Sequence, residues 1–207
     1  MTTADFRIGV LGSGSGSNCE AILKACASGR IPGRVAIVLS DVADALITER
    51  ARRYGVKSEF IGSSQLKTKL EPELEERAVR MLLDAGVRFV ALAGFMRVLK
   101  SAMLHAFRGR IVNIHPSLLP AFPGLRAWEQ ALKFGAKVTG CTVHFVDESV
   151  DGGPIIMQQA VPVLPQDTPE GLLQRIQLVE HQIYPEAIRL AAQGKLAIEG
   201  RAVKILE

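Results

Sequence analysis

Two polar residues stand at the end of an otherwise apolar run, Ile111–Pro116. In a β-strand, residues two apart point to the same face, so we expect Asn113 and His115 to project side by side. Pro116 cannot continue a central ladder, so the strand should end there, and ligands of open α/β sheets bind at such carboxyl ends. An amide that stabilises an oxyanion beside an imidazole that moves a proton suits acyl transfer, although a polar pair at a strand end is often structural.

A carboxylate that could orient the imidazole lies in the turn Asp147–Pro154. Asp151 is followed by glycine, which is ordinary turn chemistry, so a purely structural role for it stays open. A carboxylate close to an imidazole fixes the orientation of the ring and favours its charged form. Asp151 is therefore either a turn residue or the partner of a histidine.

A glycine–serine loop, Gly12–Asn18, follows the first apolar run and precedes a helix-compatible segment. Backbone N–H groups of such a loop, together with a helix N-terminus, bind anions, and a phosphomonoester is the ligand that we prefer. The dinucleotide fingerprint needs glycine where Ser17 stands, and a nucleotide P-loop needs a lysine that is absent here. Asp41, at the end of the second expected strand, keeps a nicotinamide alternative open, and a simple tight turn is another.

The remaining reactive side chains carry weaker signals. His144 lies in an alternating run and is expected to be a hydrogen-bonded sheet residue, whereas His105 is expected on a helix surface. The few histidines lack metal-ligand spacing, and the cysteines form no C-x-x-C pair. No histidine stands at a position that indicates a partner for a catalytic cysteine. We therefore expect neither a metal nor a covalent mechanism. The cysteines are Cys19, Cys26 and Cys141.

Short apolar runs alternate with helix-compatible segments through the first half of the chain. This alternation is typical of parallel strands joined by right-handed helical crossovers. The expected strands are Phe6–Leu11, Val35–Leu39, Ser58–Ile61, Phe89–Ala93 and Ile111–Ile114.

The pattern changes after residue 137. Val138–Val146 and Ile155–Val163 are expected to form a hairpin-like pair, which makes the sheet mixed at one edge. A long helix should begin at Thr168-Pro169 and kink or restart after Tyr184, because proline follows there. A small terminal hairpin is expected from Leu196–Ile198 and Ala202–Leu206. The expected fold class is α/β: a single domain over residues 1–207 with a mostly parallel twisted sheet, flanking helices in a Rossmann-like arrangement, and antiparallel strands at the C-terminal edge.

Composition excludes several classes of protein. Of 207 residues, 48% are hydrophobic and 22% are charged, which is too apolar for a disordered chain. The net charge of +4 is mild and interspersed, unlike the basic stripe of a nucleic-acid binder. No apolar run approaches the ~20 residues of a membrane span, and the start Met1–Arg7 is no secretory signal. We expect a cytoplasmic protein with no nucleic-acid and no membrane partner.

Several motifs together resemble the phosphoribosylglycinamide formyltransferase family of folate-dependent formyltransferases. The resemblance runs from residue 6 to about residue 190, and the N-x-H-P-S-L-L-P run with D-G-G-P is its most specific part. The motifs are Asn113–Pro120, Phe122–Leu125, Val143–Val146 and Asp151–Ile155, together with Ser13–Asn18 and Leu92–Leu99.

The resemblance implies a reaction and a set of ligands. Its members transfer the formyl group of 10-formyltetrahydrofolate, the co-substrate, to glycinamide ribonucleotide in purine synthesis, without a metal. It implies a catalytic trio of Asn113, His115 and Asp151. We expect a monomer or a homodimer.

The resemblance also implies where the ligands bind. The substrate phosphate would lie on the amides of Gly16, Ser17 and Asn18, and Glu180 would bind the substrate near its ribose. The folate would lie against a segment after the fourth strand, the turn before Asp151, and Asn113. That segment consists of Met96, Arg97, Val98 and Leu99.

The chain departs from the family pattern at two places. Family members often have histidines where this chain has Arg126-Ala127-Trp128, in a proline-rich segment, Pro116–Trp128, that we expect to be a mobile lid. An arginine often found near the glutamate tail of the folate is not matched clearly, and Lys67 or Lys69 is the candidate to take its place.

Three alternatives remain. A formyltetrahydrofolate hydrolase would share the trio but carry a further N-terminal domain, and a methionyl-tRNA formyltransferase would carry a further C-terminal domain. Neither extra domain is expected here. A non-catalytic nucleotide-sensing module would use the glycine loop alone and leave the trio without a role.

Overall fold

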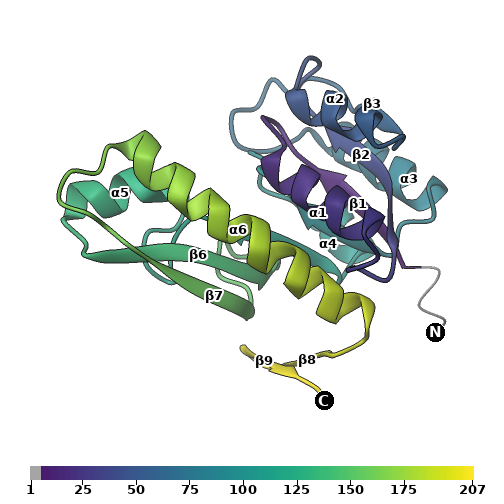
Figure 1. Ribbon diagram of the computed structural model, residues 1–207. Helices are drawn as coiled ribbons and strands as arrows, with labels where there is room; N and C mark the ends of the chain where they lie inside the picture. The colour runs from purple at the N-terminus through teal and green to yellow at the C-terminus, as the bar shows by residue number, and fades with distance from the viewer. Residues whose placement is uncertain (1–5) are drawn as a thin grey trace. The chain divides into compact units, whose positions relative to one another are not determined.

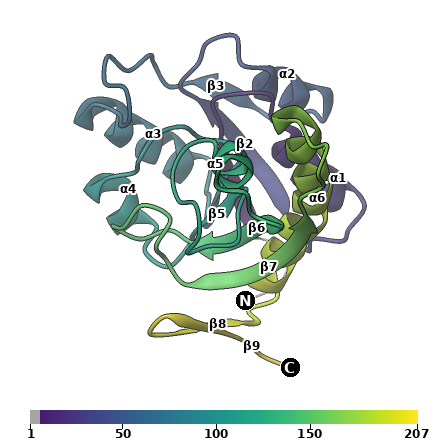
Figure 2. The same cartoon turned by 90° about the vertical axis from the view of Figure 1, so that its left-hand side faces the viewer.

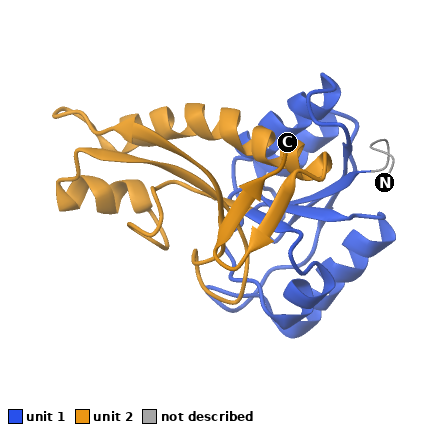
Figure 3. Cartoon of the chain, turned by 90° about the horizontal axis from the view of Figure 1, so that it is seen from below, with its two compact units in different colours: residues 1–112 blue, residues 113–207 orange. Residues whose placement is uncertain are grey.

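A computed structural model of the chain describes residues 6–207, so the prediction made for the first residues, up to Asp5, lies outside the described part. The chain divides into two compact units, residues 1–112 and residues 113–207 (Figure 3). Within residues 6–207, none of the helices combines the length and the apolarity needed to cross a bilayer. Figure 1 labels the helices and strands along the chain.

The first unit is built on parallel strands. In chain order it contains β1 (Arg7–Leu11), α1 (Ser17–Ala27), β2 (Arg34–Ser40), α2 (Leu46–Arg53), β3 (Ser58–Phe60), α3 (Pro72–Asp84), β4 (Phe89–Leu92) and α4 (Ser101–Ala106). β1 pairs in parallel with both β2 and β4, and β2 pairs in parallel with β3, which gives the order β3-β2-β1-β4. β5 (Ile111–His115) then carries the chain into the second unit.

Helices cover both faces of these parallel strands. α1 and α2 lie on one side and α3 and α4 on the other (Figure 2). Strands that are covered on both faces have no solvent side, which explains why they are continuous apolar runs rather than alternating ones. Ile8, Val10 and Leu11 of β1 are accordingly completely buried.

The strand order of the first unit reverses between β1 and β4. The loops that follow these two strands therefore lie side by side, at the point where α/β sheets bind ligands. The backbone N–H of Ser13 donates to the carbonyl of Gly94 at 3.0 Å, and the N–H of Met96 donates to the Ser13 hydroxyl at 3.0 Å. The glycine loop and the segment after β4 are thus in direct contact.

The second unit is built on antiparallel pairs. It contains α5 (Ala127–Phe134), β6 (Val138–Phe145), β7 (Ile155–Pro162), α6 (Pro169–Ala192), β8 (Leu196–Glu199) and β9 (Ala202–Ile205). β6 pairs with β7 and β8 with β9, both antiparallel, so the two predicted hairpins are confirmed. α6 packs against β6 and β7 (Figure 2).

α6 contains Pro185, where the sequence predicted a kink or a restart, and of these the kink stays a prediction. The helix runs from Pro169 to Ala192 without interruption, so the expected restart after Tyr184 is wrong. Tyr184, Ala187 and Ile188 are almost completely buried on either side of Pro185. The packing of this apolar stripe outweighs the roughly 3 kcal/mol that an interior proline costs a helix. The helix start is as predicted, because the Thr168 side chain accepts from the N–H of Gly171 at 3.1 Å.

Parallel strands in the first unit and antiparallel strands in the second confirm the expected α/β fold class. The organisation of residues 1–207 as a single domain stays a prediction.

Two glycines of the loop after β1 should respond differently to alanine. Gly16 has a φ of 75°, and a Cβ there would lie 2.7 Å from the Cα of Ile47, whereas no described atom lies within 4 Å of a Cβ at Gly14. We expect Gly16→Ala to lower the free energy of unfolding by at least about 1–2 kcal/mol, the cost of a left-handed backbone for a residue with a side chain. Gly14→Ala, the matched control, should stay within about 0.5 kcal/mol. Urea unfolding at a constant m-value measures both, and equal stabilities would contradict the prediction.

Candidate active site

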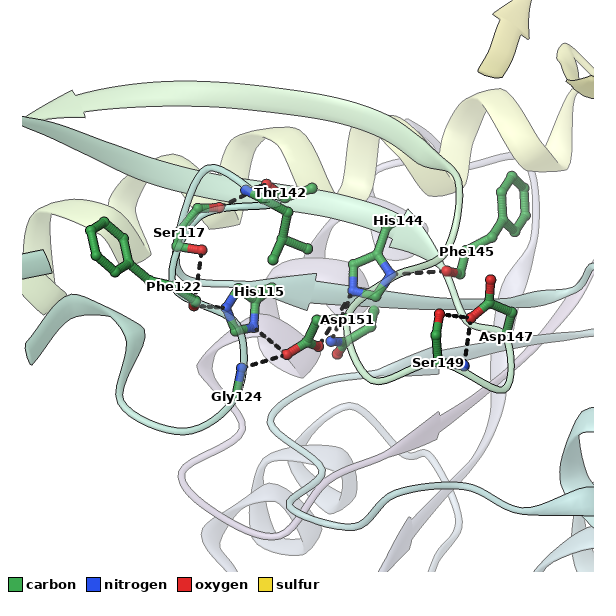
Figure 4. A network of polar contacts seen from close by, with 12 residues as sticks. His115, Ser117, Phe122, Gly124, Thr142, His144, Phe145, Asp147, Ser149 and Asp151 are labelled. Carbon is green, nitrogen blue, oxygen red and sulfur yellow. Dashed lines mark hydrogen bonds and ion pairs between the residues drawn. The ribbon is translucent and has the colours of Figure 1, made fainter. Parts of the chain in front are cut away.

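The three residues of the expected catalytic trio lie in one polar cluster of the second unit. Asn113 and His115 come from the end of β5, and Asp151 comes from the turn between β6 and β7. Nδ1 of His115 lies 3.4 Å from Oδ2 of Asp151, and the carboxylate side chain is 13% exposed (Figure 4). The structure therefore brings the imidazole and the carboxylate together, as the sequence predicted.

The Asp151 carboxylate is held from several sides. Its Oδ2 accepts a hydrogen bond from the backbone N–H of Gly124 at 2.8 Å, and its Oδ1 lies 3.8 Å from Nε2 of His144. Asp151 itself has a φ of 52°, a left-handed conformation that aspartate tolerates better than most residues. The turn thus aims this carboxylate at two imidazoles.

Both ring nitrogens of His115 face an acceptor. Nε2 lies 2.9 Å from the carbonyl oxygen of Phe122, which can only accept, so this nitrogen carries a proton. Nδ1 faces Asp151, and an imidazole donates from both nitrogens only when it is doubly protonated. The buried His115 side chain therefore stands in a site that accommodates an imidazolium.

His144 belongs to the same cluster, which the sequence did not indicate. Its Nδ1 donates to the carbonyl of Phe145 at 2.9 Å, so its Nε2 is the acceptor in the neutral ring. Nε2 lies 3.3 Å from Nδ2 of Asn113, and it accepts from that amide. Burial lowers the pKa of His144, against the opposing influence of the Phe145 hydrogen bond and the Asp151 charge, and so keeps the ring neutral.

The prediction for His144 was a hydrogen-bonded sheet residue, and its hydrogen bonds confirm this. Its place beside Asn113 could not be found from the sequence, because it depends on the pairing of segments 31 residues apart. Alternation along β6 indicates only that His144 and Thr142 share a face.

A second layer of hydrogen bonds ties the segment after His115 to β6 and β7. The Thr142 hydroxyl donates to the carbonyl of Ser117 at 2.7 Å and accepts from the N–H of Leu119 at 3.0 Å. The Gln158 amide donates to the carbonyl of Leu119 at 2.8 Å. These bonds hold the beginning of the expected lid; the mobility of Pro116–Trp128 stays a prediction.

The glycine loop of the first unit ends at a helix N-terminus. Gly16 is the N-cap of α1, and Ser17 and Asn18 are its first two residues. The N–H groups of a first helical turn have no partner within the helix and carry the positive end of its dipole. From α2, the N–H of Ile47 donates to the carbonyl of Gly14 at 3.1 Å and Nε of Arg50 to that of Ser15 at 2.8 Å. Bonds from α2 thus hold the backbone of this loop, and the binding of an anion there stays a prediction.

The expected folate segment follows β4 in the same unit. Met96 is 54% exposed, whereas Leu99 is buried. The N–H of Val98 donates to the carbonyl of Thr68 at 2.7 Å. The guanidinium of Arg97 forms an ion pair with Asp41, with Nε 2.6 Å from Oδ2, so this side chain faces the protein.

Glu180 and the cysteines complete the set of reactive side chains. Glu180 lies on α6 and is buried. Burial raises the pKa of Cys19 and of Cys141 to about 12 and that of Cys26 to about 11, and the charge of Glu180 adds to the effect on Cys141. Thiols with such pKa values are not nucleophiles at neutral pH.

Comparisons with known proteins identify relatives of this chain. The family profile described as formyl transferase matches residues 6–188. The phosphoribosylglycinamide formyltransferase of Escherichia coli (strain K12) is 42% identical over 198 residues, which cover 95% of this chain and 92% of that protein. The trifunctional purine biosynthetic protein adenosine-3 of Drosophila pseudoobscura pseudoobscura is 44% identical over 192 residues, and the chain spans 14% of its length.

A solved structure matches the whole chain. The glycinamide ribonucleotide transformylase 1 from Symbiobacterium toebii has a TM-score of 0.94 and 56% sequence identity, with 100% of this chain and 96% of that chain covered. From the extent of the family match and the identity to full-length relatives, the chain belongs to the formyl transferase family.

Proposed function

We propose that this chain transfers the formyl group of 10-formyltetrahydrofolate to the amine of N1-(5-phosphoribosyl)glycinamide. The products are N-formylglycinamide ribonucleotide and tetrahydrofolate, in the synthesis of purines. The observation that carries the proposal is the cluster of Asn113, His115 and Asp151, in which the carboxylate contacts the imidazole of His115 and the amide of Asn113 is bonded to His144. Membership of the formyl transferase family supports it.

The substrate amine is already a nucleophile, so the protein does not have to supply one. A C–N bond forms between this amine and the formyl carbon, the bond from that carbon to N10 of the folate breaks, and a proton passes from the attacking to the leaving nitrogen. The protein must hold the two reactants together, stabilise the tetrahedral oxyanion and carry the proton. The raised pKa of each cysteine fits a route without a covalent intermediate.

Asn113 is assigned to the oxyanion. Since neutral His144 accepts one hydrogen of the Asn113 amide group, it fixes which end of the amide is the donor. The second hydrogen of the same nitrogen is then available to the oxyanion. His144 is thereby a positioning residue, because it acts through Asn113.

His115 is assigned the transfer of the proton, and Asp151 is assigned the stabilisation of the positive charge on the imidazolium. In the structure, Nε2 of His115 donates to the Phe122 carbonyl at 2.9 Å, so this proton is not yet directed at the substrate. To reach the leaving nitrogen, the imidazolium exchanges this carbonyl for the substrate. Movement of the segment that contains Phe122 therefore accompanies the reaction.

The remaining residues are assigned to binding. The amides of Gly16, Ser17 and Asn18 receive the phosphate, since they form the N-terminus of α1. Met96, Val98 and Leu99 contact the folate, and Arg97 contributes through its backbone, because its guanidinium is used by Asp41. Glu180 binds the substrate near the ribose.

A rival reaction uses water in place of the amine, as in a formyltetrahydrofolate hydrolase. The decisive assay supplies 10-formyltetrahydrofolate with and without glycinamide ribonucleotide. We expect tetrahydrofolate to form only when the ribonucleotide is present. Equal rates in its absence would favour the hydrolase, and activity that requires methionyl-tRNA would favour that transferase.

We place the reaction in the cytoplasm, because the cysteines are free and suit a reducing compartment. The protein acts on small molecules as a monomer or a homodimer, with no nucleic acid and no metal. Light scattering on the purified protein determines the oligomeric state.

Truncation of the oxyanion donor is the first test of the roles. We expect Asn113→Ala to lower kcat by about 10²–10³-fold, the usual cost of one oxyanion donor, with little change in either KM. Gln193→Ala is the control, because it also truncates an amide, but one that lies at the end of α6 and is bonded to Arg189 at 2.7 Å. Near-normal turnover by folded Asn113→Ala protein would show that the donor is another group.

The neutral state of His144 should make the wild-type protein sensitive to acid. Its pKa is lowered by burial in the folded state and returns to about 6.5 on unfolding, so between the two values the unfolded state binds more protons. The contribution of neutral His144 to the free energy of unfolding is therefore fully present above about pH 6.5, and it is lost as the pH falls through the pKa of the folded state. His144→Gln keeps an acceptor for Asn113 but does not titrate, so its stability should fall less between pH 7 and pH 5. Urea unfolding across this range measures the difference; identical slopes would mean that His144 does not titrate in this way.

A further inference from the structure

Asp41 joins two loops that the proposed function assigns to different ligands. It follows β2 and is 2% exposed. Its Oδ2 accepts from Nε of Arg97 at 2.6 Å, and its Oδ1 accepts from the hydroxyl of Ser13 at 2.6 Å. The Ser13 oxygen in turn accepts from the N–H of Met96 at 3.0 Å. One buried carboxylate thus connects the glycine loop to the segment after β4.

Arg97 extends the same connection to a third loop. Its Nη1 donates to the carbonyl of Lys67 at 2.9 Å and also to that of Leu66. The guanidinium spans from the carboxylate of Asp41 to the backbone of this loop, so one ion pair helps to hold all three loops in position. The Asp41 side chain is 1% exposed and that of Arg97 16%, so solvent weakens this ion pair less than an exposed one, and the loss of Arg97 leaves a buried carboxylate without its cation.

Burial and these contacts turn the carboxylate of Asp41 away from a ribose. An acidic residue after the second strand of a dinucleotide-binding fold accepts from ribose hydroxyls. Here one oxygen is used by Ser13 and the other by Arg97, at 2.6 Å each. The carboxylate is built into the protein rather than turned toward a ligand.

We propose that Asp41 is a positioning residue that couples phosphate binding on the glycine loop to folate binding on the segment 94–99. This inference rests on the proposed function. A ligand that fixes the glycine loop also fixes Ser13, and through Asp41 and the N–H of Met96 it fixes the second segment. The second ligand then meets a loop that is already ordered, so each ligand raises the affinity for the other by the same factor.

The coupling factor is measured by calorimetry with glycinamide ribonucleotide and tetrahydrofolate, which bind together without reacting. It is the ratio of the Kd for tetrahydrofolate in the absence of the ribonucleotide to the Kd in its presence. For the wild-type protein we expect a factor of at least about five. Asp41→Asn, which removes the charge, and Ser13→Ala, which removes the bridging hydroxyl, should both reduce the factor to about one. The double variant should reduce it no further, because both changes break one connection.

A matched control is available in the second unit. Asp167 forms a similar ion pair with Arg175, with Nη1 2.6 Å from Oδ1. Asp167→Asn should leave the coupling factor at its wild-type value. Circular dichroism confirms that each variant is folded, and Ser13→Ala keeps the test valid if Asp41→Asn does not fold.

The outcomes separate the two proposals. Wild-type protein that binds both ligands with a coupling factor of one, or folded variants that keep the wild-type factor, would refute the coupling and leave the proposed function intact. Wild-type protein that binds neither ligand would refute the proposed function and the coupling together.

Discussion

The carboxylate of Asp151 is the group on which the candidate active site depends. A carboxylate that is largely removed from water is costly unless donors reach it, and here two donors come from separate segments of the second unit. The N–H of Gly124 donates to it, and Nδ1 of His115 lies 3.4 Å from it. The requirement to satisfy one charge therefore fixes the end of β5 and the loop after His115 against the turn between β6 and β7.

The same carboxylate faces two histidines whose other contacts give them opposite tasks. His144 donates from Nδ1 to the Phe145 carbonyl and accepts at Nε2 from the Asn113 amide, so the neutral ring satisfies both contacts. His115 meets an acceptor on each side, the Phe122 carbonyl and Asp151, so the charged ring satisfies both. The two histidines of one cluster thus have different roles. His144 is an acceptor that orients Asn113, and His115 carries a proton, which is the division of roles that acid–base chemistry on an acyl group requires.

The first unit offers recognition of another kind. Its glycine loop contains neither lysine nor arginine and presents backbone N–H groups at the start of α1. The loop is placed by the reversal of strand order between β1 and β4, and it is held there by Ser13, Asp41 and Arg97. The ion pair of Asp41 and Arg97 therefore contacts the loops themselves, while the loop offers main-chain groups for recognition.

The sequence alone determined the strands and most of the helices, because apolar periodicity and glycine punctuation are local signals. It also determined that Asn113 and His115 share a face, since the alternation of a strand requires it. The continuity of α6 through Pro185 was decided by tertiary structure, because burial around Tyr184 outweighs the local cost of proline. The choice between a turn residue and a histidine partner for Asp151, the place of His144 beside Asn113 and the use of Asp41 by Arg97 were also decided there. Each depends on which distant segments meet, and a buried polar group takes the partner that the fold brings to it.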